Sequence, residues 1–307
     1  SAPVRDVVPD VVDNAALKFD YLGTASYGGA ISGTGTLEQV AGTTVLTGTN
    51  TYNGSTTIDS GATLQIGNGG AAGSIGNTSG VTDGGTLAFD RSDNITFGAA
   101  ISGGGAVEQD GTGTLTLSAI NSYTGGTTIS HGAISVANHN NLGGGALNMQ
   151  NGTTLYITGT DSFGNAVTMT GDPTFNIAPA TTTTWTGLIS GTGDLDVTGG
   201  GTLVLTDTLN SYSGGTSVLG GSTLVLTDDH EIGATSGVLT LGDASTSGTL
   251  MLGGSFSRDT NRAIKLGAGG GTIDTNTFNT TVSQAISGIG GSLTKSGAGT
   301  LTLSAAN

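Results

Sequence analysis

The side chains that could carry acid–base or metal chemistry are few and scattered in this 307-residue chain. His131 stands in a Ser-His-Gly turn and His139 in a polar stretch, and both positions fit plain loops. His230 lies in Asp228-Asp229-His230-Glu231, a run of metal-competent side chains whose carboxylate oxygens suit Ca²⁺. Adjacent residues on an extended chain point in opposite directions, whereas calcium ligands converge. We therefore expect a solvated acidic loop here, with a metal site as the alternative.

Two further charged groups could mark a site. Gly193-Asp194-Leu195-Asp196 is similar to the Gly-x-Asp of calcium-binding nonapeptide repeats, but that motif must occur in tandem and is present once. It predicts an outward-facing acidic pair on a strand. Arg258, Asp259, Arg262 and Lys265 form the one mixed cluster, which could supply a base to a polysaccharide lyase. The simpler interpretation is a loop that leads into a strand at 263–266.

Other catalytic and cofactor motifs are missing from the sequence. It contains no Gly-x-Ser-x-Gly elbow, and its glycine runs have no Gly-Lys-Ser/Thr. The chain has no cysteine, so thiol catalysis, thiolate metal sites and disulfides are excluded. Trp185 is expected in the core, with a sugar-stacking platform as the alternative. We predict no catalytic, cofactor-binding or metal-binding residues, no cofactor, and a protein that is not an enzyme.

Composition predicts the kind of element that positions these residues. The chain has 58 glycines and only 9% charged residues, and its net charge is −15. Glycine disfavours helices, and the abundant threonine favours strands, so an all-β fold is expected. No Lys or Arg occurs from Ser92 to Ser257, which makes nucleic acid a poor partner because phosphate binding needs cations. No apolar run reaches the roughly 18 residues of a transmembrane helix.

Internal repeats organise the chain. A start motif with the pattern apolar-Ile-Ser-Gly-x-Gly recurs four times, at residues 30–35, 100–105, 188–193 and 285–290. Alternating Thr/Leu stretches follow, such as Thr114–Leu117 and Thr202–Leu205, and this alternation predicts half-buried strands. The isoleucines of the start motif are 70, 88 and 97 residues apart, so we expect a solenoid with whole coils inserted between the recognisable ones.

Each of the first three copies continues into a turn, Asn-x-Tyr-x-Gly followed by further Gly or Ser and Thr. We expect the glycine pair of the second and third copies, Gly125-Gly126 and Gly214-Gly215, to supply positive φ at a tight corner. The fourth copy stops at Asn307, which suggests a fragment truncated in mid-repeat. Residues 1–20 lack repeat character and are interpreted as a leading segment or the start of an N-terminal cap. Residues 21–307 are interpreted as the solenoid.

The stretch Gly111–Thr128, with its Gly-Thr-Leu-x-Leu strand and Asn-x-Tyr-x-Gly-Gly-Thr-Thr turn, resembles the autotransporter-associated β-strand repeat. That repeat occurs in passenger domains of Gram-negative type V secreted proteins. The resemblance implies a right-handed parallel β-helix, here of roughly 14 coils. It also implies export by a signal peptide and attachment through a C-terminal outer-membrane barrel, both expected outside this chain. It supplies no catalytic residues.

The resemblance leaves several functions open. The leading hypothesis is a non-catalytic surface scaffold, tethered or released, that mediates self-association, biofilm formation or host attachment. The alternative is a β-helix-borne enzyme or toxin whose active part lies near Arg258–Lys265 or outside the chain. Binding of ice or mineral by flat threonine ladders would need Thr-x-Thr at the same position in every coil, and the irregular repeats argue against it.

Overall fold

A computed structural model describes residues 9–256, 262–288 and 290–306. The chain divides into two compact units: unit 1 comprises Ser1–Ser135 and Asn140–Ala146, and unit 2 comprises Val136–His139 and Leu147–Asn307. Each unit is a parallel β-solenoid, and the chain makes about 14 turns in all. The predicted all-β parallel β-helix is confirmed. Among the described residues no helix is long and apolar enough to cross a membrane.

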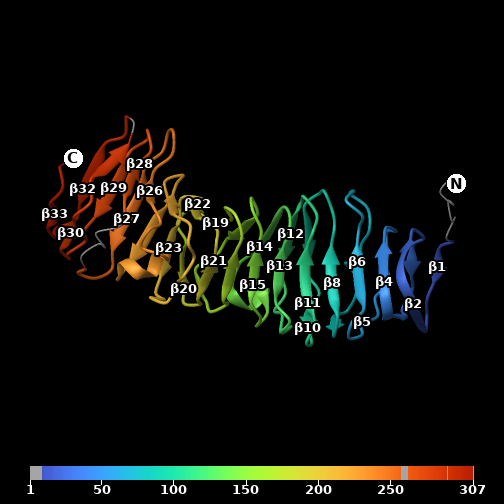
Figure 1. Cartoon of the computed structure of the whole chain (residues 1–307). Coiled ribbons are helices and arrows are strands. Elements are labelled where there is room, and N and C mark those ends of the chain that lie inside the picture. Colours follow the sequence, from blue (N-terminus) through green and yellow to red (C-terminus); the bar gives the residue numbers. More distant parts are fainter. Residues whose placement is uncertain (1–8, 257–261, 289, 307) are drawn as a thin grey trace. The chain divides into compact units, whose positions relative to one another are not determined.

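Unit 1 is built from short strands that stack coil upon coil (Figure 1). The larger sheet has the order β10-β7-β5-β4-β6-β8-β11-β13, with β2 beside β4, and β9-β12-β14 form a second run. The strands are β1 (Val11–Val12), β2 (Ala16–Tyr27), β3 (Ile31–Ser32), β4 (Thr36–Leu46), β5 (Thr56–Ile58), β6 (Thr63–Ile66), β7 (Val81–Asp83), β8 (Thr86–Phe89), β9 (Ile95–Phe97), β10 (Ile101–Ser102), β11 (Ala106–Gln109), β12 (Thr114–Leu117), β13 (Thr127–Ile129) and β14 (Ala133–Val136). β2 runs across residues 20 and 21, where the sequence suggested that the solenoid begins.

Unit 2 has three longer runs of strands and one pair. The first run is β15-β18-β21, and the second, called the β16–β31 sheet, is β16-β19-β22-β24-β26-β28-β31. The third, called the β17–β32 sheet, is β17-β20-β23-β25-β27-β29-β32, and β30 pairs with β33.

The bounds of these strands are β15 (Leu147–Met149), β16 (Thr154–Ile157), β17 (Asp161–Phe163), β18 (Val167–Met169), β19 (Thr174–Ile177), β20 (Thr182–Trp185), β21 (Ile189–Gly191), β22 (Leu195–Thr198), β23 (Thr202–Leu205), β24 (Thr216–Val218), β25 (Thr223–Leu226), β26 (Leu239–Leu241), β27 (Gly248–Leu252), β28 (Ile264–Leu266), β29 (Gly271–Asp274), β30 (Thr280–Val282), β31 (Ile286–Gly288), β32 (Leu293–Ser296) and β33 (Leu301–Leu303). Two 3₁₀ helices, η1 (His139–Leu142) and η2 (Asp229–Ile232), are the helical elements of the described residues.

The core consists of apolar columns that run through consecutive coils. Leu203, Leu224, Leu250 and Ile273 are in register on neighbouring strands, and all four are fully buried. Alternation places the next residues on the outer face, so each strand buries leucine and leaves threonine half-buried on the outside. Because each coil packs mainly on its neighbours, stability accumulates along the stack. The inserted coils are also confirmed, since β7, β8, β26 and β27 lie between recognisable repeats.

Glycine is required in the Ile-Ser-Gly start motif for two reasons. Gly33, Gly103 and Gly191 have φ of 106°, 111° and 112°, a region that other residues reach only at a cost. A Cβ at each would also lie 2.1 Å from a backbone oxygen of the preceding coil. In the later turns, positive φ is found at Gly126 but not at Gly54, Gly125, Gly214 or Gly215. The expected positive φ is thus present in the pair Gly125-Gly126 and absent from the pair Gly214-Gly215. Close approach of another coil explains the glycines that lack it, since a Cβ would lie 2.0 Å from the Gly35 oxygen at Gly54 and 2.7 Å from the Val238 oxygen at Gly215.

Candidate functional site

Arg262, a member of the mixed charged cluster, is a buried structural residue rather than an accessible base. Its side chain is fully buried and its Nε donates to Asp229 Oδ2 at 2.9 Å. Nη1 donates to the carbonyls of Ile232 and Gly237, and Nη2 to those of Asp229 and Gly233, at 3.0–3.2 Å. These five bonds use all five N–H groups of the guanidinium. Arg262 therefore fixes the loop 227–237 and has no donor left for a substrate.

The run 228–231 is not the solvated acidic loop that the sequence suggested. Asp229 and Glu231 are buried in η2, the first against Arg262 and the second through bonds to Thr227, whose backbone N–H donates to Glu231 Oε2 at 2.8 Å. Burial raises the pKa of Glu231. The expectation fails because η2 turns Asp229 and Glu231 toward the interior, where they are bound by Arg262 and Thr227, while Asp228 and His230 stay outside.

The histidines and the remaining charged candidates lie apart from one another. His131 is exposed at a corner. The Nδ1 atoms of His139 and His230 lie 2.8 and 2.7 Å from Asp161 Oδ2 and Asp228 Oδ1. Within the part of the chain that the structure describes, no three His, Asp or Glu side chains are grouped to hold a metal ion.

The two residues of the predicted acidic pair have different surroundings, and so do the described members of the mixed cluster. Asp196 is half-buried on β22, and burial raises its pKa, whereas Asp194 precedes the strand and accepts the backbone N–H of Gly215 at 2.6 Å. Lys265 is exposed on β28, the strand that was expected at 263–266. Arg258 and Asp259 lie outside the described residues.

Trp185 lies in the core, as expected, and is no platform for a sugar. It is fully buried, stacked on Phe163 with ring centroids 5.1 Å apart and tilted against Phe175 at 4.9 Å. Its indole N–H donates to the Asn165 carbonyl at 3.0 Å, so the polar end is satisfied inside the protein.

The asparagine of each Asn-x-Tyr turn joins the two halves of the repeat, a role that sequence inspection missed. Asn50, Asn121 and Asn210 each accept, through Oδ1, the backbone N–H of the isoleucine in the preceding start motif, at 2.8, 2.9 and 2.7 Å. The constant order of the two motifs along the chain is the signal that could have indicated this contact.

The tyrosine of the same turn is a buried polar anchor. Tyr52, Tyr123 and Tyr212 are hydrogen-bonded to the threonine four residues later, with oxygen–oxygen distances of 2.7, 2.6 and 2.7 Å. Burial raises the pKa of all three phenols, that of Tyr52 to about 12. The repeated motif thus encodes a structural unit, and its polar residues are not available for catalysis.

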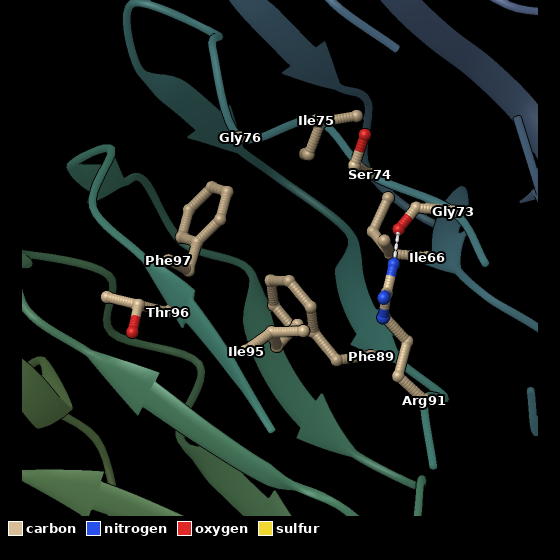
Figure 2. Close-up of a pocket in the computed structure, with 10 residues that line it drawn as sticks. All are labelled: Ile66, Gly73, Ser74, Ile75, Gly76, Phe89, Arg91, Ile95, Thr96 and Phe97. Carbon is tan, nitrogen blue, oxygen red and sulfur yellow. Dashed lines mark hydrogen bonds between the residues drawn. The ribbon is translucent and has the colours of Figure 1, made fainter. Parts of the chain in front are cut away.

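Unit 1 contains a pocket of about 270 Å³. Gly73–Gly76 lines one side and the rings of Phe89 and Phe97 lie opposite, 5.3 Å apart in an edge-to-face arrangement (Figure 2). Arg91 lies at its edge, where Nη1 donates to Gly73, Nη2 donates to Ala71, and Nε and Nη2 bind Asp93. The pocket can hold an apolar group, but its one ionised group is already bound by protein.

The most regular outward-facing feature is a row of threonines on the β17–β32 sheet. The members, in register on six consecutive strands, are Thr182, Thr202, Thr223, Thr249, Thr272 and Thr294. The parallel row two residues on contains Thr184, Val204, Val225, Met251, Asp274 and Ser296. We call these two rows the threonine face. The Thr-x-Thr pattern occurs on one strand, β20. The first row is all threonine, and the second contains three apolar residues, two hydroxyl residues and Asp274.

Comparison with known proteins confirms the resemblance. The passenger-associated-transport-repeat family model matches residues 41–66, 107–136, 195–227 and 293–307. The adhesin BmaC autotransporter of Brucella suis biovar 1 (strain 1330) is 32% identical over 189 residues, which are 48% of this chain and 6% of that relative. The chain thus spans a small part of the length of this relative. No solved structure matches the chain. The chain carries autotransporter passenger repeats.

Proposed function

We propose that these autotransporter passenger repeats are part of a non-catalytic adhesin on the surface of a Gram-negative bacterium, where the chain associates with copies of itself on neighbouring cells. The passenger is held at the outer membrane or released after cleavage. The similar stretch of a relative named as an adhesin supports the adhesive role. The engagement of Arg262, Asp229 and Trp185 in the interior supports a scaffold rather than an enzyme.

The observation that carries this proposal is the in-register repetition of uncharged side chains on the outer face. In unit 2 the threonine row continues over six strands. In unit 1, Thr57, Thr82 and Ser102 are likewise in register on β5, β7 and β10. Each hydroxyl makes a weak contact, but parallel rows multiply such contacts by avidity when many chains are displayed on one cell.

The test is clumping of inert beads coated with the purified chain, with beads that carry an unrelated β-rich protein as the control. We expect coated beads to clump with one another. Binding of the beads to host cells without mutual clumping would replace self-association by host attachment. Hydrolysis of polysaccharide, or cell lysis, by the purified chain would contradict the non-catalytic role.

A further inference from the structure

We infer that the threonine face is the surface through which two copies of this chain meet, face to face. This inference rests on the proposed self-association and names its site. The face lies on described strands of unit 2, and alternate residues, including Leu203, Leu224 and Leu250, are buried behind it. The hydroxyls and apolar side chains in front are therefore held on a rigid support.

The chemistry of the face is complementary to itself. A threonine hydroxyl both donates and accepts a hydrogen bond, so a row of hydroxyls can be satisfied by a second identical row. Val204, Val225 and Met251 form an adjacent apolar stretch that gains from removal of water. When one copy is turned over on the other with its strand order reversed, the two threonine rows face each other, so that Thr223 lies opposite Thr249 and Val225 opposite Met251. No charged side chain of β20, β23, β25 or β27 loses its water, because none lies on the face.

Charge selects this face over the neighbouring one. The chain carries a net charge of −15, so two copies repel each other, and the repulsion is least when they meet through an uncharged surface. The two rows of the threonine face contain one charged residue, Asp274, near one end. On the β16–β31 sheet, by contrast, the outward row Asp196, Ser217, Thr240 and Lys265 contains an acid and a base. A second copy docked there would have to desolvate both.

The interval between neighbouring strands also favours a second copy of this chain as the partner. Neighbouring strands are about 4.8 Å apart, so the threonines repeat at that interval along the solenoid. A second copy repeats at the same interval, and its hydroxyls therefore stay in step over all six strands. A partner with another period matches one or two positions and then falls out of step. The match of identical strand spacings is the principle that also orders paired sheets in stacked β assemblies.

The size of the face predicts weak pairing and strong clumping. Six strands about 4.8 Å apart and four residues long cover about 400 Å² on each copy. The total of about 800 Å² is below the roughly 1,200 Å² of a stable specific interface. A single pair of chains should therefore separate in dilute solution, while a surface coated with many copies should hold through avidity.

The experiment uses bead clumping with two pairs of opposite substitutions. One bead population carries Thr223→Glu with Thr249→Glu, the pair at the centre of the row, and another carries Thr223→Lys with Thr249→Lys. The matched control carries Ser217→Glu with Thr240→Glu, which are half-buried, in register on adjacent coils of the β16–β31 sheet, and change the net charge equally. Circular dichroism and Trp185 fluorescence verify that each variant is folded.

We expect each threonine-face variant alone to clump about tenfold more slowly than wild type, because like charges meet across the contact. Mixed Glu and Lys beads should clump again, and the control should behave as wild type. Wild-type clumping should also increase with salt, which screens the repulsion between acidic chains. Unchanged clumping of the face variants, or no rescue in the mixture, overturns the face-to-face inference and leaves self-association standing. Absence of wild-type clumping removes both.

Discussion

Two loops of the chain are each held by one arginine from a later strand region, yet one loop is closed and the other borders a pocket. In unit 2, Arg262 reaches back to the loop after β25 and is fully buried. In unit 1, Arg91 reaches back to the loop after β6 and keeps 13% of its side chain exposed. Both arginines bind loop carbonyls and one aspartate, so the difference must come from the loops.

The lengths of the two loops differ. Ile232 follows Leu226 by six residues and its loop forms the 3₁₀ helix η2, whereas Ile75 follows Ile66 by nine. Both isoleucines are buried, so the longer, glycine-rich loop must accommodate three more residues between equivalent anchors. It does so without a helix, and the pocket lined by Phe89 and Phe97 lies beside it. A short loop with a central arginine closes, and a longer one leaves space.

The two units also differ in whether a buried aspartate has a charged partner. Asp229 in unit 2 pairs with Arg262. Asp83 in unit 1 is fully buried on β7, where Oδ1 accepts the Gly85 N–H at 2.9 Å and Oδ2 has no hydrogen-bond partner. Burial raises the pKa of Asp83 to about 6. Asp229 in unit 2 is therefore neutralised by an arginine, whereas Asp83 in unit 1 is not. Substitutions can test the effect of each arrangement on stability.

The largest effect is expected from Arg262→Met. The change leaves Asp229 buried without its partner and four loop carbonyls without a donor, so the free energy of unfolding of unit 2 should fall by about 3–5 kcal/mol. Trp185 fluorescence during urea unfolding reports on unit 2 directly. Lys265→Met removes the same charge from an exposed position and should change the value by less than about 0.5 kcal/mol. Equal effects of the two substitutions would show that Arg262 is not the residue that closes the loop.

Asp83→Asn is expected to act in the opposite direction. The pKa of Asp83 is raised in the folded state, so its contribution to stability is fully present below the unfolded pKa and is lost as pH rises through about 6. At pH 8 the amide should therefore stabilise unit 1 by about 2 kcal/mol, and at pH 4 by little. Hydrogen exchange of unit 1 peptides, compared between variant and wild type at each pH, measures this. A gain that is the same at both pH values would exclude the carboxylate as its cause.

Arg91→Met should lower the free energy of unfolding by less than Arg262→Met does. Arg91 is partly exposed, and Asp93, with 42% of its side chain exposed, can be hydrated when the arginine is removed. We expect a loss of about 1 kcal/mol, mainly from the carbonyls of Ala71 and Gly73. Faster hydrogen exchange confined to the loop 67–76 would support this, whereas unfolding of the whole of unit 1 would place Arg91 on a par with Arg262.

The sequence predicts those features that depend on neighbouring residues within a strand. Alternation of Thr and Leu in Thr202–Leu205 and Thr223–Leu226 specifies which face of each strand is buried. The alignment of Thr182, Thr202, Thr223, Thr249, Thr272 and Thr294 is harder to foresee, because the intervals vary between 20 and 26 residues. The structure keeps the row in register by placing the additional residues in loops, such as the one that contains η2.

Contacts that join distant coils are not visible in the sequence pattern. Arg262 binds Asp229, 33 residues earlier, and neither residue belongs to the repeated motif. The sequence predicts a solvated acidic run at 228–231, since nothing near Asp229 in the chain indicates the arginine that binds it in the interior. Asn121 and Tyr123 were similarly assigned to a turn, although their hydrogen bonds to Ile101 and Thr127 place them inside the solenoid. In a coil that is stacked on others, polarity alone does not distinguish an inward side chain from an outward one.

The smallest effect is expected from filling the pocket at Gly76. A Cβ there meets no atom within 4 Å, Gly76 does not have positive φ, and Gly76 lines the same pocket as Phe89 and Phe97. We therefore expect the side chain of Gly76→Leu to enter the pocket without strain. The buried area and the smaller entropy of the unfolded chain should stabilise unit 1 by about 0.5–1 kcal/mol. Gly73→Ala is the contrast, because Gly73 has φ of 99° and its Cβ would lie 2.3 Å from the Leu46 oxygen, so it should destabilise. Slower exchange in the first variant and faster exchange in the second would establish that the longer loop leaves real space that a side chain can occupy. Destabilisation by both would mean that the pocket cannot accept a leucine, and that the two loops are packed equally well.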